Sequence, residues 1–435
     1  MAGDDPKPGE KQELTGAPLN TWASFQNEIY GTFKDTPFPV AYDKLEKAAK
    51  KKLPSGNYNY VAGSAGSFED TARANREAFN DYHIIPHMLR DVNNRDTSIT
   101  LFGQKHAAPL LLAPVGVQGI MHPDAEEATA RAAERVGIGM ILSTAATRSM
   151  EKVAAANGDG LRWYQLYWPV SKDFTLSLLS RAKASGYKAL VVTLDTFSLG
   201  FRPRDLEQAY LPFLKGEGCQ MYFSDPVFMK KHGEDHTDTK WNGPGESPVG
   251  VEAQSRDETQ KYRLLELSLA ALQETSRGHF FTWEDVAFLR ENWDGPLILK
   301  GIQCAEDAEK AIDAGVNGIV VSNHGGRQVN GATASLRALD KITQSAKVKN
   351  SDLTILFDSG IRSGADMVKA LALGAHACLL GRPFMWGLAL GGEEGVEHVL
   401  RCLLADFEIT MALSGRRTIK DLDRSILVHN KASKL

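Results

Sequence analysis

Short, continuously apolar runs recur along the chain at intervals of a few tens of residues. They begin near residues 109, 139, 162, 189, 296, 318, 353 and 377 and read PLLLAPV, GMILST, RWYQLY, ALVVTLD, PLILKG, GIVVSN, LTILFD and ACLLG. The apolar residues are consecutive and do not alternate with polar ones, which is typical of parallel strands that are covered on both faces. The pattern therefore predicts a series of eight buried parallel strands.

Helical stretches separate these strands. The segments AEEATARAAERVG, TLSLLSRAKASG and AEDAEKAIDAG are rich in alanine and charge, and each ends on a glycine, a common residue just past a helix end. Eight strand–helix units in series predict an α/β fold of the (β/α)8 TIM-barrel type. An open, doubly wound sheet is the alternative, but no Gly-x-Gly-x-x-Gly follows the first strand, so the barrel is favoured.

Three segments lie outside this rhythm. Residues 1–40 carry proline, glycine and charge without periodicity and are expected to form a loosely held polar arm, followed by a helix in AYDKLEKAAKKKLP that ends at Pro54. The barrel is expected to span 41–430, with a tail at 431–435. Because about a hundred residues separate Asp195 from Pro296, an insertion is predicted over about 206–280. It is either a lid or assembly arm at the active face or a loose surface loop.

Composition excludes several classes of function. Hydrophobic residues make up 43% and charged residues 24% of the chain, which is ordinary for a globular protein, and the net charge of −4 gives no basic footprint for nucleic acid. No run of roughly 18 apolar residues predicts a membrane span, and the polar N-terminus lacks the apolar core of a secretory signal. The four cysteines are widely spaced, which argues against metal sites and disulfides and for reduced thiols inside a cell.

The last three residues are Ser433, Lys434 and Leu435. A terminal Ser-Lys-Leu is an address that the peroxisomal import receptor reads. The surrounding HNKASKL is polar enough to be exposed. The sequence therefore predicts a peroxisomal location.

Polar and charged residues gather at the predicted strand ends, where a barrel places its chemistry. They include Ser143, Gln165, Tyr167, Thr193, Asp195, Lys300, His324, Arg327 and Asp358. In the run VVSNHGGRQVNG, a tight turn with a solvated arginine and a hydrogen-bonded histidine would be the plain interpretation. Because a lysine and two carboxylates stand at neighbouring predicted strand ends, the interpretation of His324 as a catalytic base beside an anion-binding arginine is favoured.

The last two strands are followed by glycine–arginine turns that open helices. Backbone N–H groups at a helix start, together with arginine side chains, form a phosphate site, and barrels commonly place one after their seventh and eighth strands. A phosphorylated ligand is therefore expected, bound by Gly360, Arg362, Gly381 and Arg382.

Lys300 and His324 each suggest a reaction. Lys300 could form a Schiff base, as in a lyase, or it could remain cationic and stabilise negative charge on a bound cofactor. His324 beside Arg327 favours oxidation of an acid, in which the imidazole takes a proton and the arginine holds the carboxylate. Asp195 could orient the imidazole and stabilise its protonated form.

The runs SNHGGRQ, DSGIRSGADMVKALALGA and GRP resemble the FMN-dependent α-hydroxy acid oxidase and dehydrogenase family, and the resemblance extends from about Tyr42 to Ile426. Within that family, TLDTFSLGFRPRDL, SDPVFMKKH and GLALGGEEGVEHVLRCLLAD are most similar to the lactate 2-monooxygenase branch.

The resemblance implies a role for each candidate residue. His324 would be the base and Asp195 its partner, with Arg202, Arg327, Tyr60 and Tyr167 around the substrate carboxylate. Lys300 would lie against the pyrimidine end of FMN and stabilise its reduced anion. The remaining residues would hold FMN: Ala113, Pro114, Val115, Gly116, Ser143, Gln165 and Thr193 at the ring, Asp358 at the ribityl chain, and Gly360, Arg362, Gly381 and Arg382 at the phosphate.

One position departs from the family pattern. Ala145 stands where glycolate-oxidising members carry a large aromatic residue, so the pocket should admit at least a methyl group and an L-2-hydroxy acid of lactate size is expected. No haem-binding segment precedes the barrel in this sequence, so O2 is the expected acceptor. The lactate 2-monooxygenase outcome (acetate, CO2 and water) is preferred, and release of 2-oxo acid and hydrogen peroxide by an oxidase is the alternative.

Two other functions are compatible with some of these residues. A Schiff-base lyase built on Lys300 belongs to another class of enzyme, and a catalytically silent flavin-binding protein is disfavoured by the intact set of polar residues. The resemblance also implies a homo-oligomer, a tetramer or larger.

Overall fold

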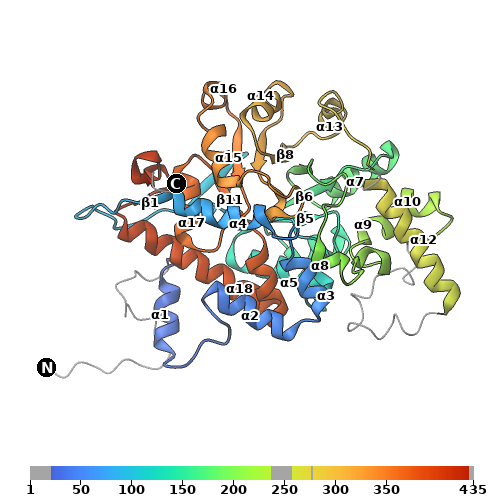
Figure 1. Cartoon of the computed structure of the whole chain (residues 1–435), viewed down its shortest axis with the longest axis horizontal. Coiled ribbons are helices and arrows are strands. Elements are labelled where there is room, and N and C mark those ends of the chain that lie inside the picture. Colours follow the sequence, from blue (N-terminus) through green and yellow to red (C-terminus); the bar gives the residue numbers. More distant parts are fainter. Residues whose placement is uncertain (1–20, 237–256, 276–277, 431–435) are drawn as a thin grey trace.

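The computed structural model describes residues 21–236, 257–275 and 278–430. Eight parallel strands form a closed barrel in the spatial order β10-β11-β4-β5-β6-β7-β8-β9 (Figure 1). The strands are β4 (Leu110–Leu112), β5 (Gly139–Ser143), β6 (Arg162–Tyr167), β7 (Leu190–Thr193), β8 (Leu297–Ile302), β9 (Gly318–Val321), β10 (Thr354–Phe357) and β11 (Ala377–Leu380). Each predicted strand is present, and the predicted TIM barrel is confirmed.

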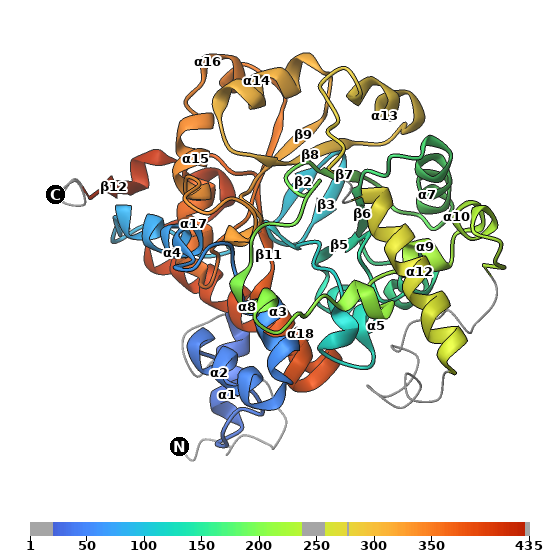
Figure 2. The same cartoon turned by 45° about the vertical axis from the view of Figure 1, so that its right-hand side comes forward.

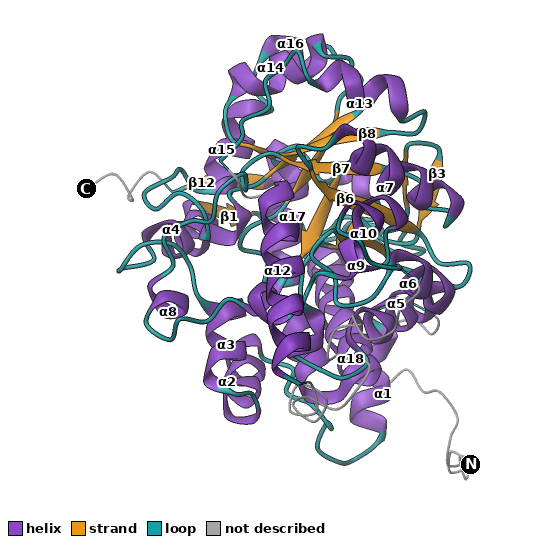
Figure 3. Ribbon diagram, turned by 90° about the vertical axis from the view of Figure 1, so that its right-hand side faces the viewer, coloured by secondary structure: helices purple, strands orange, loops and turns teal. Residues whose placement is uncertain are grey.

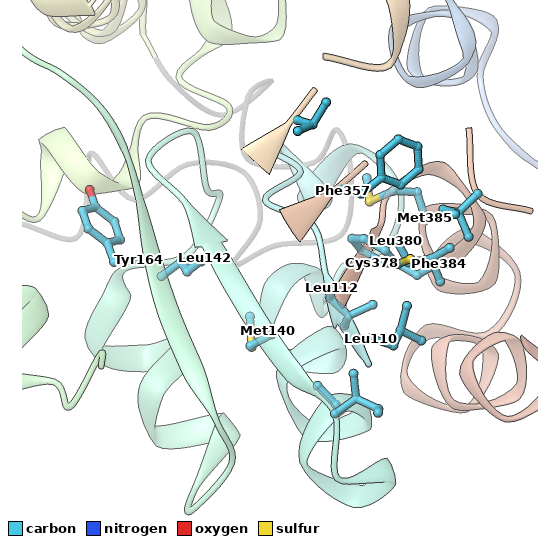
Figure 4. Packing of buried hydrophobic residues seen from close by; sticks show 14 of the residues in the cluster. Leu110, Leu112, Met140, Leu142, Tyr164, Phe357, Cys378, Leu380, Phe384 and Met385 are labelled. Carbon is cyan, nitrogen blue, oxygen red and sulfur yellow. The ribbon is translucent and has the colours of Figure 1, made fainter. Parts of the chain in front are cut away.

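The continuous apolar runs reflect burial on both faces of the barrel wall. Leu111, Ile141 and Val320 belong to a core inside the barrel, whereas their neighbours along the strands pack outward against the helices. Figure 4 shows part of this outer layer, in which Leu112 and Leu380 lie near Phe384 of the last helix. Because successive side chains on a strand point to opposite faces, both halves of each run must be apolar.

Helices surround the barrel (Figure 2). They are α5 (Ala125–Val136), α6 (Met150–Asn157), α7 (Lys172–Ala184), α13 (Val286–Asn292), α14 (Ala305–Asp313), α15 (Ser335–Ile342), α16 (Ala346–Lys349), α17 (Gly364–Ala372) and α18 (Arg382–Leu413). The amino-terminal end of the barrel is covered by the hairpin of β2 (Ile99–Leu101) and β3 (Gln104–His106), and β1 (Tyr82–Ile84) pairs with β12 (Leu427–His429).

The expectation of a loosely held polar arm over residues 1–40 is wrong for part of its length. Residues 24–31 form α1 (Ser24–Gly31), which precedes α2 (Tyr42–Lys52), α3 (Ser55–Ala62) and α4 (Asp70–Glu77). The Ala23 N–H donates to Glu408 Oε2 on α18 at 2.8 Å, and the Arg401 guanidinium lies 4.0 Å from the Phe25 ring centroid. These contacts with α18 stabilise a helix that the local sequence pattern does not predict.

The long connection between β7 and β8 contains α8 (Pro203–Leu206), α9 (Gln220–Phe223), α10 (Pro226–Lys231) and α12 (Glu258–Thr275), with a 3-10 turn over Pro212–Lys215. The helix α12 runs along one side of the barrel, beside α9 and α10 (Figure 3). The described part of the insertion is therefore packed and is not a loose loop. The tail 431–435 and part of the insertion lie outside the described residues.

Two loops at the carboxyl end of the barrel are held together by one buried carboxylate. Glu126, at the start of α5, accepts hydrogen bonds from the N–H groups of Gln118 at 3.1 Å, Thr147 at 2.9 Å and Arg148 at 3.1 Å. The side chain is fully buried. It therefore joins the loop after β4 to the loop after β5.

We expect Glu126→Ala to lower the free energy of unfolding by about 3 kcal/mol or more, because it leaves three buried N–H groups without an acceptor. The midpoint of urea unfolding of the purified protein measures the effect. The neighbouring Glu127→Ala is the matched control. Glu127 makes one partly exposed ion pair at 3.8 Å to Arg148, so its loss should cost less than about 1 kcal/mol. Equal effects of the two changes would contradict this account of Glu126.

Candidate active site

A cavity opens at the carboxyl ends of the barrel strands and contains about 1340 Å³ of space, the solvent at its mouth included. That is ample for a cofactor together with a small substrate. Most of the predicted site residues line it: Tyr60, Ala113, Pro114, Val115, Gly116, Tyr167, Arg202, Lys300, His324, Arg327, Asp358, Gly360, Arg362, Gly381 and Arg382. The other four, Ser143, Gln165, Thr193 and Asp195, are bonded to one another or to these residues behind the wall. The sequence-predicted set therefore comes together in one place.

A histidine–aspartate pair stands at the rim. His324 follows β9 at a φ of 59°, an uncommon conformation for a residue with a side chain, and Gly326 follows in a φ of 80°. A Cβ on Gly326 would lie 2.7 Å from the Ala72 backbone nitrogen, so only glycine fits there. The Nδ1 atom of His324 lies 2.8 Å from Asp195 Oδ1. A carboxylate only accepts hydrogen bonds, so the Nδ1 atom carries the proton and the Nε2 atom is left as the basic nitrogen.

Burial and neighbouring charges shift the pKa values of His324 and Asp195. Burial, together with the positive charges of Lys300 and Arg202, lowers the pKa of His324, although Asp195 acts in the opposite direction. Burial acts to raise the pKa of Asp195, but the attraction and hydrogen bond of His324 and the charge of Lys300 outweigh it and lower that pKa to about 2. At neutral pH the imidazole is therefore neutral and the carboxylate is ionised, as a general base and its orienting partner require.

Lys300 lies at the end of β8, almost fully buried. Its Nζ atom donates to Ser322 Oγ at 3.1 Å and lies 3.3 Å from Asp358 Oδ2. Burial acts to lower the pKa of Lys300, but Asp358 and Asp195 raise it above its usual value. The amine is consequently cationic, whereas Schiff-base formation needs it neutral. The geometry speaks against the lyase alternative and for a positive charge held at the cavity wall.

Two arginines concentrate positive charge beside Tyr60. Arg327 donates to the Gly63 carbonyl at 2.9 Å and to the Tyr60 carbonyl, and Arg202 donates to the Arg327 carbonyl at 3.0 Å. Among the described residues, neither guanidinium lies within ion-pair distance of a carboxylate. Burial and the proximity of Arg202 lower the pKa of Arg327. A bound carboxylate would relieve this repulsion and accept a bidentate hydrogen bond.

Tyrosine hydroxyls complete this region. Burial raises the pKa of Tyr60 and of Tyr167, so both phenols remain protonated at neutral pH and can donate hydrogen bonds. The Arg327 guanidinium lies 5.1 Å from the Tyr60 ring centroid. Two cations and two neutral donors on one wall form a suitable site for a carboxylate.

The predicted phosphate site differs in one respect from expectation. The Arg362 and Ser363 N–H groups at the start of α17 donate to Asp366 Oδ2 at 2.9 and 3.1 Å, so they are already satisfied. At the second turn, α18 begins at Arg382 directly after Gly381, but Pro383 has no N–H and the Phe384 N–H donates to the Gly381 carbonyl at 3.2 Å. The positive charges of the Arg362 and Arg382 side chains, which line the cavity, are thus the better candidates for an anion site.

A buried polar chain lies behind the cavity. Ser143 Oγ donates to Gln165 Oε1 at 3.0 Å, and Gln165 Nε2 donates to Thr193 Oγ1 at 2.9 Å. The three side chains belong to the ends of adjacent strands β5, β6 and β7. They form a polar floor that can hydrogen-bond the edge of a planar heteroaromatic ring.

Comparison with known proteins fits this site. A model of the FMN-dependent dehydrogenase family matches residues 49–429. The chain is 46% identical over 414 residues to an FMN-dependent alpha-hydroxy acid dehydrogenase of Penicillium citrinum, which covers 94% of this chain and 96% of the relative. It is 39% identical over 394 residues to an L-lactate oxidase of Lysinibacillus sphaericus, with 91% and 94% covered.

The chain belongs to the FMN-dependent dehydrogenase family. FMN is accordingly its cofactor, and the protein is an FMN-dependent L-2-hydroxy acid oxidoreductase. A crystal structure of mandelate oxidase has the same fold, with a TM-score of 0.72 at 35% identity, and covers 90% of this chain and 98% of that one.

The residues present fit FMN. The cavity has the Arg362 and Arg382 cations for a phosphate, and the polar floor of Ser143, Gln165 and Thr193 can face a flavin ring. A Cβ on Gly116 would lie 2.7 Å from the Ala145 Cβ, whereas at Gly381 it would meet nothing nearer than 3.9 Å. The backbone is therefore tightly packed beside the floor and open beside the phosphate site.

Several residues of this FMN-dependent enzyme escaped the sequence analysis. Thr196 Oγ1 donates to Asp195 Oδ1 at 2.8 Å, and Ser322 and Ser359 hydrogen-bond the His324 and Gly325 N–H groups. Thr196 and Ser359 directly follow the predicted Asp195 and Asp358, and Ser322 lies two residues before His324, so the polar residues at the strand ends could have pointed to all three. Leu199, Phe213, Tyr222 and Ala271 also line the cavity, but they lie in the long connection between β7 and β8, where no strand end indicated their position.

The pH dependence tests the histidine–aspartate pair. Since the pKa of His324 lies below its usual value of 6.5, we expect kcat/KM to hold as the pH falls to 6.5 and to decline only below it. Asp195→Asn removes the charge that raises this pKa, so it should lower kcat/KM at least tenfold and move the acid limb to lower pH. The measurement is a pH profile of flavin reduction by substrate. An acid limb that moves to higher pH in Asp195→Asn would contradict the assignment.

Proposed function

We propose that this enzyme oxidises an L-2-hydroxy acid with O2 and releases the 2-oxo acid and hydrogen peroxide. The observation that carries the proposal is the neutral His324, oriented by Asp195 at 2.8 Å, on the same cavity as the unpaired Arg202 and Arg327. A base and a carboxylate site on one cavity suit removal of protons from the carbon and oxygen next to an acid group.

The oxidase outcome replaces the monooxygenase outcome that the sequence motifs favoured. The relatives described above are named as dehydrogenases and oxidases, and 2-hydroxyacid oxidase 1 of Homo sapiens is a further one, 36% identical over 395 residues with 91% and 98% covered. These comparisons support release of peroxide better than its consumption inside the site.

Oxidation of the carbinol to a ketone removes two electrons and two protons from the substrate. Arg202 and Arg327 bind the carboxylate, and the Tyr60 and Tyr167 hydroxyls donate to it, which orients the 2-hydroxyl and its carbon toward His324. The Nε2 atom of His324 takes a proton, and Asp195 stabilises the resulting imidazolium. FMN, when bound, would supply the two-electron chemistry: it would take the electron pair with the second proton, and O2 would finally receive both electrons and both protons as hydrogen peroxide. Lys300 keeps a positive charge where negative charge develops.

The remaining predicted residues would hold the cofactor. The backbone from Ala113 to Gly116 and the floor of Ser143, Gln165 and Thr193 would contact the ring, and Asp358 would hold the ribityl chain. Gly360, Arg362, Gly381 and Arg382 would bind the phosphate.

Replacement of the base separates chemistry from cofactor binding. We expect His324→Ala to retain FMN and its yellow spectrum but to lower the rate of flavin reduction by 10²–10⁴-fold, the usual contribution of a general base. Anaerobic stopped-flow absorbance measures this rate. The same change at the surface, His83→Ala, should leave it unaltered. A rate in His324→Ala within threefold of the unmodified enzyme would rule out the base assignment.

Product analysis tests the oxidase outcome. With L-lactate as the probe, we expect one pyruvate and one hydrogen peroxide for each O2 consumed, and no acetate or CO2 above the amount formed by free peroxide and pyruvate. Added catalase distinguishes the two sources, because it removes released peroxide but not peroxide retained in the site. Acetate that persists with catalase present would instead establish the monooxygenase.

Two aspects of the cell biology remain part of the proposal. Ser433-Lys434-Leu435 lies outside the described residues and would direct the enzyme through the import receptor to the peroxisome, where peroxide is consumed. Family membership supports a homo-oligomer, a tetramer or larger. Among the described residues, no helix is long and apolar enough to cross a membrane.

A further inference from the structure

Beside Ala145, the active-site cavity is bounded by residues of the connection between β7 and β8. We use the name side-chain chamber for the part lined by Leu199, Phe213, Cys219, Tyr222, Ala271 and Leu272. Cys219 and Ala271 are each 1% exposed and Tyr222 is 5% exposed, so these walls are interior surfaces, whereas Leu199 is 39% exposed and stands at the open side. Phe213, Tyr222, Ala271 and Leu272 come from the Pro212–Lys215 turn, α9 and α12, and Cys219 directly precedes α9; α9 and α12 lie together beside the barrel (Figure 2).

The chamber adjoins the place where a substrate would bind. A Cβ on Gly218 would lie 3.0 Å from the Ala145 carbonyl oxygen, and the Gln220 N–H donates to the Ala146 carbonyl at 3.3 Å. The insertion therefore rests directly on the loop after β5. On the other side, the ring centroids of Tyr60 and Phe213 lie 6.5 Å apart. The carboxylate donors and the apolar walls are thus immediate neighbours.

The polar atoms of the chamber walls are already engaged. The Tyr222 hydroxyl lies 3.2 Å from Thr275 Oγ1, and the Cys219 thiol donates to the Phe213 carbonyl at 3.7 Å. None of the six wall residues carries a charge. The chamber consequently presents hydrocarbon surfaces, and a polar group placed there would lose its hydrogen bonds to water without replacement.

We infer that the side-chain chamber selects L-2-hydroxy acids with an unbranched or aromatic apolar side chain of about four carbons or more, so that lactate is a poor substrate. The inference rests on the proposed function and names its substrate class. A methyl group would leave most of the chamber walls without contact. Each methylene that enters an apolar site improves transition-state binding about three- to fourfold, so the preference should grow with chain length until α12 is reached.

A panel of acids with the unmodified holoenzyme tests the preference directly. L-2-Hydroxyhexanoate, L-lactate and L-malate share the reacting group and differ in the side chain. We expect kcat/KM for flavin reduction to be at least tenfold higher for L-2-hydroxyhexanoate than for L-lactate, and lower for L-malate than for both. Equal or higher kcat/KM with L-lactate would overturn the inference and leave the proposed function intact. If none of these acids nor L-phenyllactate reduces the flavin, the proposed function fails as well.

A pair of variants on α12 tests whether the chamber is responsible. Ala271→Phe fills the chamber from a buried wall position, whereas Ala270→Phe makes the same change at the adjacent, half-buried position, which does not line the cavity. The ratio of kcat/KM for L-2-hydroxyhexanoate to that for L-lactate should fall at least tenfold in Ala271→Phe and stay within twofold in Ala270→Phe. An unchanged ratio in a folded, yellow Ala271→Phe protein would show that the side chain binds elsewhere and overturn the inference. If that variant does not fold, the acid panel still decides.

Discussion

Closure of the barrel is the constraint on which the site depends. The pairing of β11 with β4, in which Leu379 lies opposite Leu111, joins the last strand to the first and forces all eight carboxyl ends onto one rim. Residues as distant in sequence as Tyr60 and Arg382 therefore share one cavity. Short apolar strands buried on both faces supply the free energy for this closure, and the polar residues just beyond their ends are positioned as a consequence.

The rim also sets the electrical character of the site. Four arginines and Lys300 line the cavity, while Asp195 and Asp358 offset only part of their positive charge. Excess positive charge in a poorly hydrated space is unfavourable unless an anion enters. A bound phosphate and a bound carboxylate would relieve it, so binding of cofactor and substrate also stabilises the folded enzyme.

The barrel and most of the site residues could be predicted from the sequence, because in a barrel the residues that follow each strand all lie at the same end. A strand that is apolar on both faces has a recognisable pattern, and its last residues must lie at the rim, as Lys300 and His324 do. The structure was needed where contacts between distant parts of the chain determine whether a helix forms or whether an N–H group is free. The helix α1 is too short to be stable alone and depends on Glu408 and Arg401 of α18, which lie more than 370 residues away in the chain. Likewise, the capping of α17 by Asp366 withdraws N–H groups that the glycine–arginine pattern predicted to be free.

The division of labour between rim and insertion has a consequence for how such enzymes diverge. The base, its partner and the cations stand at the ends of strands whose packing tolerates little change. Each of these strands pairs with two neighbouring strands and packs against apolar residues on both of its faces. Ala271, Tyr222 and Phe213 lie on a single excursion of the chain between β7 and β8, and none of the three belongs to a barrel strand. Mutations there can accumulate, and whole segments can be exchanged, without disturbing the electron-transfer machinery. Substrate choice and chemical mechanism can therefore evolve separately, because they depend on different segments of one polypeptide.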